Sequence, residues 1–199
     1  KDKTSYLIIF LTNFFLRYAD LFFCISYNIF KELRLFKVPS NKIIKINNAI
    51  VDNDFFKKSI KPITNKKVPN KTDYILSIGR LTEQKNHLML LKSFIEIKKK
   101  YRQKLSLVLI GEGHLEKKLK NFFKINKIKK DVIFLKNLQN VLNYIKNCKL
   151  FIQTSLWEGQ PNVLIEALLL KKQVIATNCP GQNKKNLNKF KNFNILKVN

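Results

Sequence analysis

The sequence predicts an α/β fold built on a doubly wound, mostly parallel sheet. The first observation is that, from residue 74 onward, short apolar runs alternate with segments whose apolar residues recur at helical spacing. Strands that alternate with helices in this way form βαβ units, whose strands run parallel. The second observation is that all five glycines follow these apolar runs, and none precedes residue 79. In a doubly wound sheet the ligand crevice lies at the carboxyl ends of the strands, where backbone approaches the ligand closely.

Composition sets the outer bounds. The 199 residues, 45% of them hydrophobic, suffice for one core and some additional structure. The net charge of +26 favours anionic partners in general. It is spread over the chain as Lys among Asn and Ile, so it singles out no partner. Cys24, Cys148 and Cys179 lie far apart without metal-site or disulfide spacing, which predicts a reducing, cytoplasmic environment.

The first 60 residues are expected to form a smaller part of the fold. An aromatic-rich helix is predicted over 5–17, and its apolar stretch is too short to span a bilayer. A buried strand over 20–26 and a helix over 27–36 follow, and Pro39 stops that helix. Residues 42–50 predict one further strand. We assign residues 1–60 to the remnant of an N-terminal domain and its hinge.

The chain from 57 to 72 is rich in Lys, Asn and Pro and poor in apolar residues, as linkers are. We therefore place a linker at 61–72 and a second domain at 73–199. In that domain Asn86 and Asn140 are each predicted to cap a helix. The predicted strands are 74–78, 105–110, 132–135, 150–152, 174–177 and 193–198. The predicted helices are marked by Leu88, Leu91, Phe94 and Ile95, by Leu115, Leu119, Phe122 and Phe123, by Val141, Leu142, Ile145 and Cys148, and by Val163, Leu164, Ala167 and Leu168.

The loop after the first of these strands, GRLTEQKN from Gly79 to Asn86, carries two cations. Arg80 offers a planar fork for a phosphate, and Lys85 places a point charge near the start of the next helix. The three spaced glycines of a dinucleotide-binding turn are missing here, which argues against a nicotinamide or flavin enzyme.

The stretch EGQPNVLIEA, residues 158–167, places two carboxylates around a helix start. Pro161 suits the first helical turn, whose free amides attract anions. Glu158 and Glu166 nevertheless stand beside those amides. A ligand with both phosphates and hydroxyls would satisfy both kinds of group. A helix with one acid near its positive end and another in its middle is the alternative, and this stretch alone leaves both open.

Three motifs in this order give the chain a specific resemblance. The loop at 79–86, the segment LIGEG at 109–113 and the stretch at 158–167 are similar to the signature series of group 1 glycosyltransferases. The resemblance covers residues 73–180 well and 19–56 more loosely. It implies two facing Rossmann-like domains (the GT-B arrangement), of which this chain holds mainly the C-terminal, donor-binding one, and retention of configuration at the transferred sugar.

The resemblance also implies residue roles. Arg80 and Lys85 would grip the diphosphate of a nucleotide-sugar donor and, with Glu158 near the sugar, form the catalytic set. Glu166 would accept hydrogen bonds from the ribose hydroxyls. The loop 136–140 would border the base. The substrate-binding set is completed by Gly79, Gly159, Gln160, Pro161, Asn162 and Val163.

The implied reaction uses the nucleotide-diphosphate sugar as a substrate and needs neither cofactor nor metal. The implied acceptor is an envelope polysaccharide or a lipid-linked sugar. A cytoplasmic protein is expected, with peripheral contact with an anionic membrane left open. The segment CPG at 179–181 also fits the family, but residues 182–187 lack the acid often found there and receive no role.

Other candidates favour structural interpretations. Asp52 and Asp54 resemble a metal-binding acid pair, but a solvated turn is the better interpretation at this place. His87 and His114, the only histidines, offer no nucleophile–base pair and are assigned capping or surface roles. Trp157 could either stack on a sugar or fill the core.

Three hypotheses follow. The first is the donor-binding part of a glycosyltransferase that is truncated at both ends. The second is a remnant that binds the nucleotide without turnover. The third is a basic nucleic-acid-binding module, which ranks last because no aromatic–basic recognition motif is present.

Overall fold

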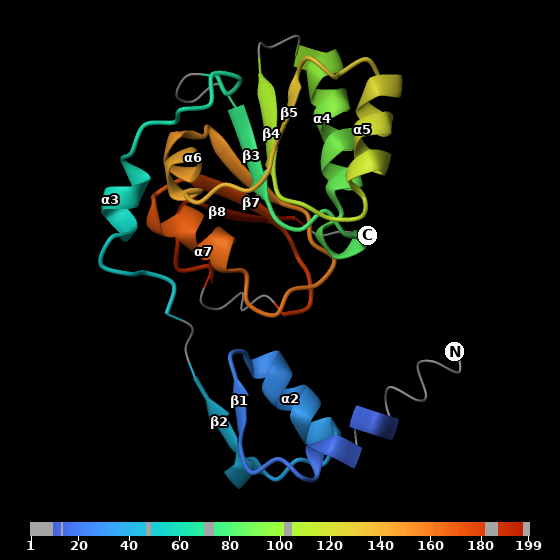
Figure 1. Cartoon of the computed structure of the whole chain (residues 1–199), viewed down its shortest axis with the longest axis vertical. Helices are drawn as coiled ribbons and strands as arrows, with labels where there is room; N and C mark the ends of the chain where they lie inside the picture. Colours follow the sequence, from blue (N-terminus) through green and yellow to red (C-terminus); the bar gives the residue numbers. More distant parts are fainter. Residues whose placement is uncertain are drawn as a thin grey trace. The chain divides into compact units, whose positions relative to one another are not determined.

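A computed structural model of the chain describes residues 10–12, 14–46, 49–69, 74–101, 105–181 and 187–196. The chain divides into two compact units, Lys1–Asn48 and Ala49–Asn199, which we describe separately (Figure 1). No helix among these described residues is long and apolar enough to cross a membrane.

The first unit holds a two-stranded parallel sheet and a helix. Strand β1 (Phe22–Cys24) pairs with β2 (Ile43–Lys45), and helix α2 (Tyr27–Leu35) connects them with the short 3₁₀ helix η1 (Ser40–Lys42). The hydroxyl of Ser26 caps α2 by accepting a hydrogen bond from the amide of Ile29. The helix predicted over 5–17 is helical at 10–12 and 14–16, and its beginning lies outside the described residues.

The second unit contains the predicted doubly wound sheet. Its six strands run in the order β5-β4-β3-β6-β7-β8, and every neighbouring pair is parallel. The strands are β3 (Tyr74–Ile78), β4 (Ser106–Ile110), β5 (Val132–Leu135), β6 (Leu150–Gln153), β7 (Gln173–Thr177) and β8 (Phe193–Leu196). The predicted α/β class is therefore confirmed, with strand limits within two residues of those expected.

Helices cover both faces of this sheet (Figure 1). On one face lie α4 (His87–Tyr101) and α5 (Glu116–Ile125), and on the other lie α3 (Phe55–Ser59), α6 (Leu142–Asn147) and α7 (Asn162–Leu169). Alternate residues of β3 and β4 enter two separate apolar cores, as a parallel strand buried on both faces requires. Leu76 and Val108 belong to the core under α6 and α7, whereas Ile75 and Leu107 belong to the core under α4 and α5.

The boundary between the two units lies earlier in the chain than the linker we placed at 61–72. Helix α3, which we did not predict, packs on α6, and Phe55 and Val68 are buried in the core of the second unit. Side-chain amides also hold this segment, because Asn140 Nδ2 donates to the carbonyl of Lys58 and Asn143 Nδ2 to that of Pro62. These contacts attach residues that look polar and linker-like to the sheet domain.

The cap predictions had different outcomes. The N-cap of α6 is Val141, one residue after the predicted one, although Asn140 Oδ1 accepts from the amide of Leu142 at the start of the helix. Asn86 precedes α4, but its side-chain amide donates to the sulfur of Met89, and its backbone is left-handed at φ 45° and ψ 44°.

The strand order reverses between β3 and β6. From β3 the chain continues to β4 and β5 on one side, and it then returns to place β6, β7 and β8 on the other. In open α/β sheets, ligands bind outside the carboxyl ends of the strands at such a switch point. The two loops that meet here are residues 79–86 after β3 and residues 154–161 after β6.

Candidate functional site

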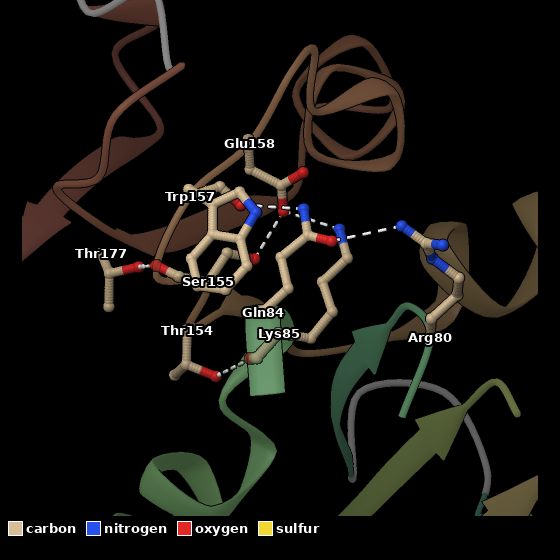
Figure 2. A network of polar contacts seen from close by, with 8 residues as sticks. All are labelled: Arg80, Gln84, Lys85, Thr154, Ser155, Trp157, Glu158 and Thr177. Atoms are coloured by element: carbon tan, nitrogen blue, oxygen red, sulfur yellow. Dashed lines mark hydrogen bonds and ion pairs between the residues drawn. The ribbon is translucent and has the colours of Figure 1, made fainter. Parts of the chain in front are cut away.

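An ion pair joins the two loops at the switch point (Figure 2). Lys85 Nζ lies 2.6 Å from Glu158 Oε1, and the two side chains are 18% and 5% exposed. Lys85 belongs to the 3₁₀ helix η2 (Glu83–Lys85), which follows β3. The fold therefore brings together two residues that are 73 positions apart in the sequence and that we assigned to the same site.

A buried hydroxyl also holds the Glu158 carboxylate. Ser155 Oγ donates to the same oxygen, Oε1, at 2.5 Å. Thr177, at the end of β7, donates in turn to the carbonyl of Ser155 at 2.6 Å. Glu158 is thus oriented by groups from the ends of three neighbouring strands, β3, β6 and β7.

Gln84 forms a second connection between the loops. Its side-chain amide donates to the backbone carbonyl of Trp157 at 3.0 Å, and its backbone carbonyl accepts from the amide of Leu156 at 2.8 Å. The guanidinium of Arg80 donates to Oε1 of Gln84 at 3.2 Å. Arg80 is exposed, whereas the Lys85 side chain is largely buried.

Two glycines allow the loops to approach. At Gly79 an added Cβ would lie 3.1 Å from the Lys85 stem, so the lysine side chain runs directly over this residue. Gly181 has φ +92°, and a Cβ there would lie 1.3 Å from the carbonyl oxygen of Glu158. The amide of Glu158 also donates to the carbonyl of Pro180 at 2.8 Å, so the segment 179–181 packs directly against the backbone at Glu158.

The residues after Glu158 lead into helix α7. A Cβ at Gly159 would meet no atom within 4 Å, so the space beside its backbone is open. Pro161 immediately precedes α7 and Asn162 begins it, while Val163 packs against the core. The buried Oε1 of Gln160 has no hydrogen-bond partner among the described residues.

Glu166 lies on the second turn of α7 and lines a separate cavity of about 330 Å³. The cavity is also lined by Gln139 and Asn140 from the loop after β5 and by residues 49–52. Burial raises the pKa of the Glu166 carboxyl, and its Oε2 atom has no hydrogen-bond partner in the described part of the chain. The structure therefore places the two glutamates differently, with Glu158 in the ion-pair network and Glu166 beside the loop that we assigned to the base.

Of the residues we interpreted structurally, the aspartates and His114 lie at the surface. Asp52 and Asp54 pair with Lys58 and Lys57, and His114 pairs with Glu83. His87 instead is buried at the start of α4, where burial and the nearby Lys85 charge lower its pKa to about 4. Trp157 does not fill the core, because it is half exposed.

Sequence reasoning missed the polar residues that support the site. Gln84, Ser155 and Thr177 received no role, although Gln84 and Ser155 lie within or beside the quoted motifs. The available signal was that each of them lies at or beyond the carboxyl end of a strand, Gln84 after β3, Ser155 after β6 and Thr177 at the end of β7. Their partners depend on strand order, which the sequence pattern did not give.

The second unit is a Rossmann-like α/β domain, and the loops at its switch point bring Arg80, Lys85 and Glu158 close together. The sequence profile of the family described as "Glycosyl transferases group 1" matches residues 58–195. The chain therefore belongs to the group 1 glycosyltransferases.

The chain matches part of the length of two curated relatives. It is 31% identical over 182 residues to an uncharacterised glycosyltransferase of Methanocaldococcus jannaschii, covering 88% of this chain and 44% of that one. It is 32% identical over 143 residues to a Campylobacter jejuni protein, covering 72% and 37%. That relative is the N-acetylgalactosamine-N,N'-diacetylbacillosaminyl-diphospho-undecaprenol 4-alpha-N-acetylgalactosaminyltransferase. The chain thus spans less than half the length of either relative.

Solved structures share the fold. A glycosyltransferase from Rickettsia africae superposes with a TM-score of 0.72 at 20% identity, over 94% of this chain and 53% of that one. The Anabaena protein HepE, solved in complex with UDP and glucose, gives 0.66 at 18% identity, over 83% and 46%. At these identities the likeness establishes the GT-B type of fold and the Rossmann-like character of the second unit.

Proposed function

We propose that the chain supplies the donor-binding part of a retaining glycosyltransferase that transfers sugar from a nucleotide-diphosphate sugar to an envelope polysaccharide or glycolipid. Arg80 and Lys85 neutralise the departing diphosphate, and Glu158 orients the donor sugar. The acceptor hydroxyl attacks the anomeric carbon as the bond to the diphosphate breaks, and the hydroxyl proton passes to an oxygen of the departing diphosphate. Cations already in place stabilise the charge that develops on the leaving group, which lowers the barrier.

The observation that carries this proposal is the meeting of Lys85 and Glu158 at the switch point of the sheet. A cation and an acceptor side by side suit a ligand that presents phosphates and hydroxyls together. The open space beside the Gly159 backbone provides room for the same ligand, and the helix start that follows favours its phosphates.

The cavity beside Glu166 supports a nucleoside subsite. A buried carboxyl with an unpartnered oxygen is costly, and the two hydroxyls of a ribose would supply the missing donors. Gln139 and Asn140 would then border the base. UDP is the first nucleotide to test, because HepE was solved with it.

The remaining assignments belong to the same proposal. Neither a metal nor a cofactor takes part, since Arg80 and Lys85 carry the countercharge of the diphosphate. The acceptor is lipid-linked, as the name of the Campylobacter relative suggests. A cytoplasmic position in peripheral contact with an anionic membrane would bring the chain to such an acceptor.

Isothermal titration calorimetry with UDP tests the site. Lys85→Ala and Glu166→Ala should each weaken binding at least about tenfold, because each removes a hydrogen bond that involves a charged group. Lys92→Ala, which removes an exposed lysine of α4, is the matched control and should leave the affinity unchanged. Equal affinities in all three variants would disprove the assignment of the site.

A further inference from the structure

We propose that Trp157, together with its neighbour Leu156, forms a stacking platform for a pyranose ring beside the Glu158 carboxylate. The inference builds on the proposed function, since it requires that a sugar binds beside the loops after β3 and β6. It assigns a role to an apolar surface that neither the core nor the polar network uses.

The first observation is the exposure of these two side chains. Trp157 is 50% exposed and Leu156 is 42% exposed, whereas the residues on either side, Ser155 and Glu158, are buried. A single exposed apolar residue is ordinary on a protein surface. Two adjacent ones next to a buried charged pair form an exposed apolar lip beside polar groups.

The second observation is that the backbone under this lip is held in place. The amide of Leu156 donates to the Gln84 carbonyl at 2.8 Å, and the carbonyl of Trp157 accepts from Gln84 Nε2 at 3.0 Å. The amide of Glu158 donates to the carbonyl of Pro180 at 2.8 Å. A platform whose backbone is already ordered loses little conformational entropy when a ligand binds, which favours affinity.

The third observation concerns the free side of Glu158. Lys85 and Ser155 both bind Oε1, and no hydrogen bond to Oε2 is found within the described ranges. Figure 2 shows that the second carboxylate oxygen points away from Lys85 and Ser155. An acceptor without a protein partner therefore lies one residue from an exposed indole.

Pyranose rings match this combination. One side of such a ring presents C–H groups, which pack on an aromatic face, and its edge presents hydroxyl donors, which pair with a carboxylate. The sugar could belong to the nucleotide donor or to the acceptor, and both present the same ring chemistry. A uracil base could also stack on the indole, and this outcome would contradict the proposal.

Trp157 is the only tryptophan in the chain, so its fluorescence reports on this position alone. Emission and acrylamide quenching of the wild-type protein would be followed in three titrations. The first adds UDP, and the second adds UDP-N-acetylgalactosamine or UDP-glucose. The third adds N-acetylgalactosamine or methyl α-glucoside to protein saturated with UDP. We expect UDP alone to leave the emission unchanged. A donor-sugar contact shifts the emission to the blue and protects Trp157 from quenching in the second titration, and an acceptor contact does so in the third.

Two substitutions separate stacking from a structural role. Trp157→Ala should remove the gain in affinity that the responding sugar gives, a loss of about fivefold, while calorimetric affinity for UDP stays at the wild-type value. Trp157→Phe, which keeps an aromatic face, should retain most of the gain. The proposal is overturned if UDP alone moves the emission as much as its sugars do. It is equally overturned if UDP binds and no sugar has an effect. Failure of UDP to bind wild-type protein would instead overturn the proposed function.

Discussion

Lys85 Nζ and Glu158 Oε1 lie 2.6 Å apart and join the loops that follow β3 and β6. These are the two strands between which the order of the sheet reverses. The pair therefore has a structural consequence as well as a place in the proposed chemistry. Both side chains are largely withdrawn from water, so each charge depends on the other for compensation.

Breaking this pair from one side should destabilise the domain. Lys85→Met leaves the Glu158 carboxylate buried beside Ser155 without its cation, and we expect the free energy of unfolding to fall by about 3 kcal/mol. Urea denaturation followed by circular dichroism measures this change. The double variant Lys85→Met with Glu158→Gln should recover most of the loss, because no charge is then left unpaired. A double variant no more stable than Lys85→Met would show that the pair does not couple the loops.

Replacing Glu166 should stabilise the free chain while weakening nucleotide binding. Burial raises the pKa of this carboxyl, so its ionised form is less favourable in the folded state than in the unfolded state. The resulting loss of stability is fully present above the pKa of this carboxyl in the folded state. It disappears below the pKa of the carboxyl in the unfolded state, which is about 4.3. Glu166→Gln should therefore raise Tm at pH 8 and have little effect near pH 3.5. A lower Tm at pH 8, or unchanged UDP affinity, would contradict this account of the residue.

His87 should make the domain sensitive to mild acid. Its pKa falls from 6.5 to about 4 on folding because of burial and, to a lesser degree, the Lys85 charge. The unfolded chain therefore binds the proton more tightly. The contribution of His87 to the free energy of unfolding is fully present above about pH 6.5. It is lost as the pH falls towards 4, by about 3 kcal/mol in total.

Unfolding free energies measured between pH 4 and 8 test this expectation. His87→Leu should flatten the profile because it removes the buried titrating group. His114→Leu is the matched control, since that histidine is exposed in its pair with Glu83 and should leave the slope in place. An equal slope in wild type and His87→Leu would show that other groups cause the acid sensitivity.

Asn86 should tolerate glycine better than any residue with a branched side chain. Its backbone has φ 45° and ψ 44°, a left-handed conformation that costs most residues about 1–2 kcal/mol but costs glycine little. Asn86→Gly should leave Tm within a few degrees of wild type, whereas Asn86→Val should lower it clearly in a thermal melt. Similar Tm values for both variants would argue against a left-handed residue between β3 and α4.

The sequence by itself determined the local elements of the second unit. Strands β3 and β4 were predictable because both faces are buried, so 74–78 and 106–110 are apolar apart from one serine in each. Helix α5 was predictable because Leu119 and Phe123 recur at helical spacing. The family motifs also marked Lys85, Glu158 and Glu166, since these residues follow strands within the family's motifs.

The tertiary structure decided which of these residues meet. Only the placement of β6 beside β3 sets Lys85 against Glu158, and a different strand order with the same elements would separate them. It also attached α3 to the second unit, because α3 packs on α6, whose residues lie more than eighty positions later in the chain. Ser155, Thr177 and Gln84 gained their roles in the same way. A hydrogen bond depends on distance in space, and spacing along the chain does not reveal that distance for residues on different strands.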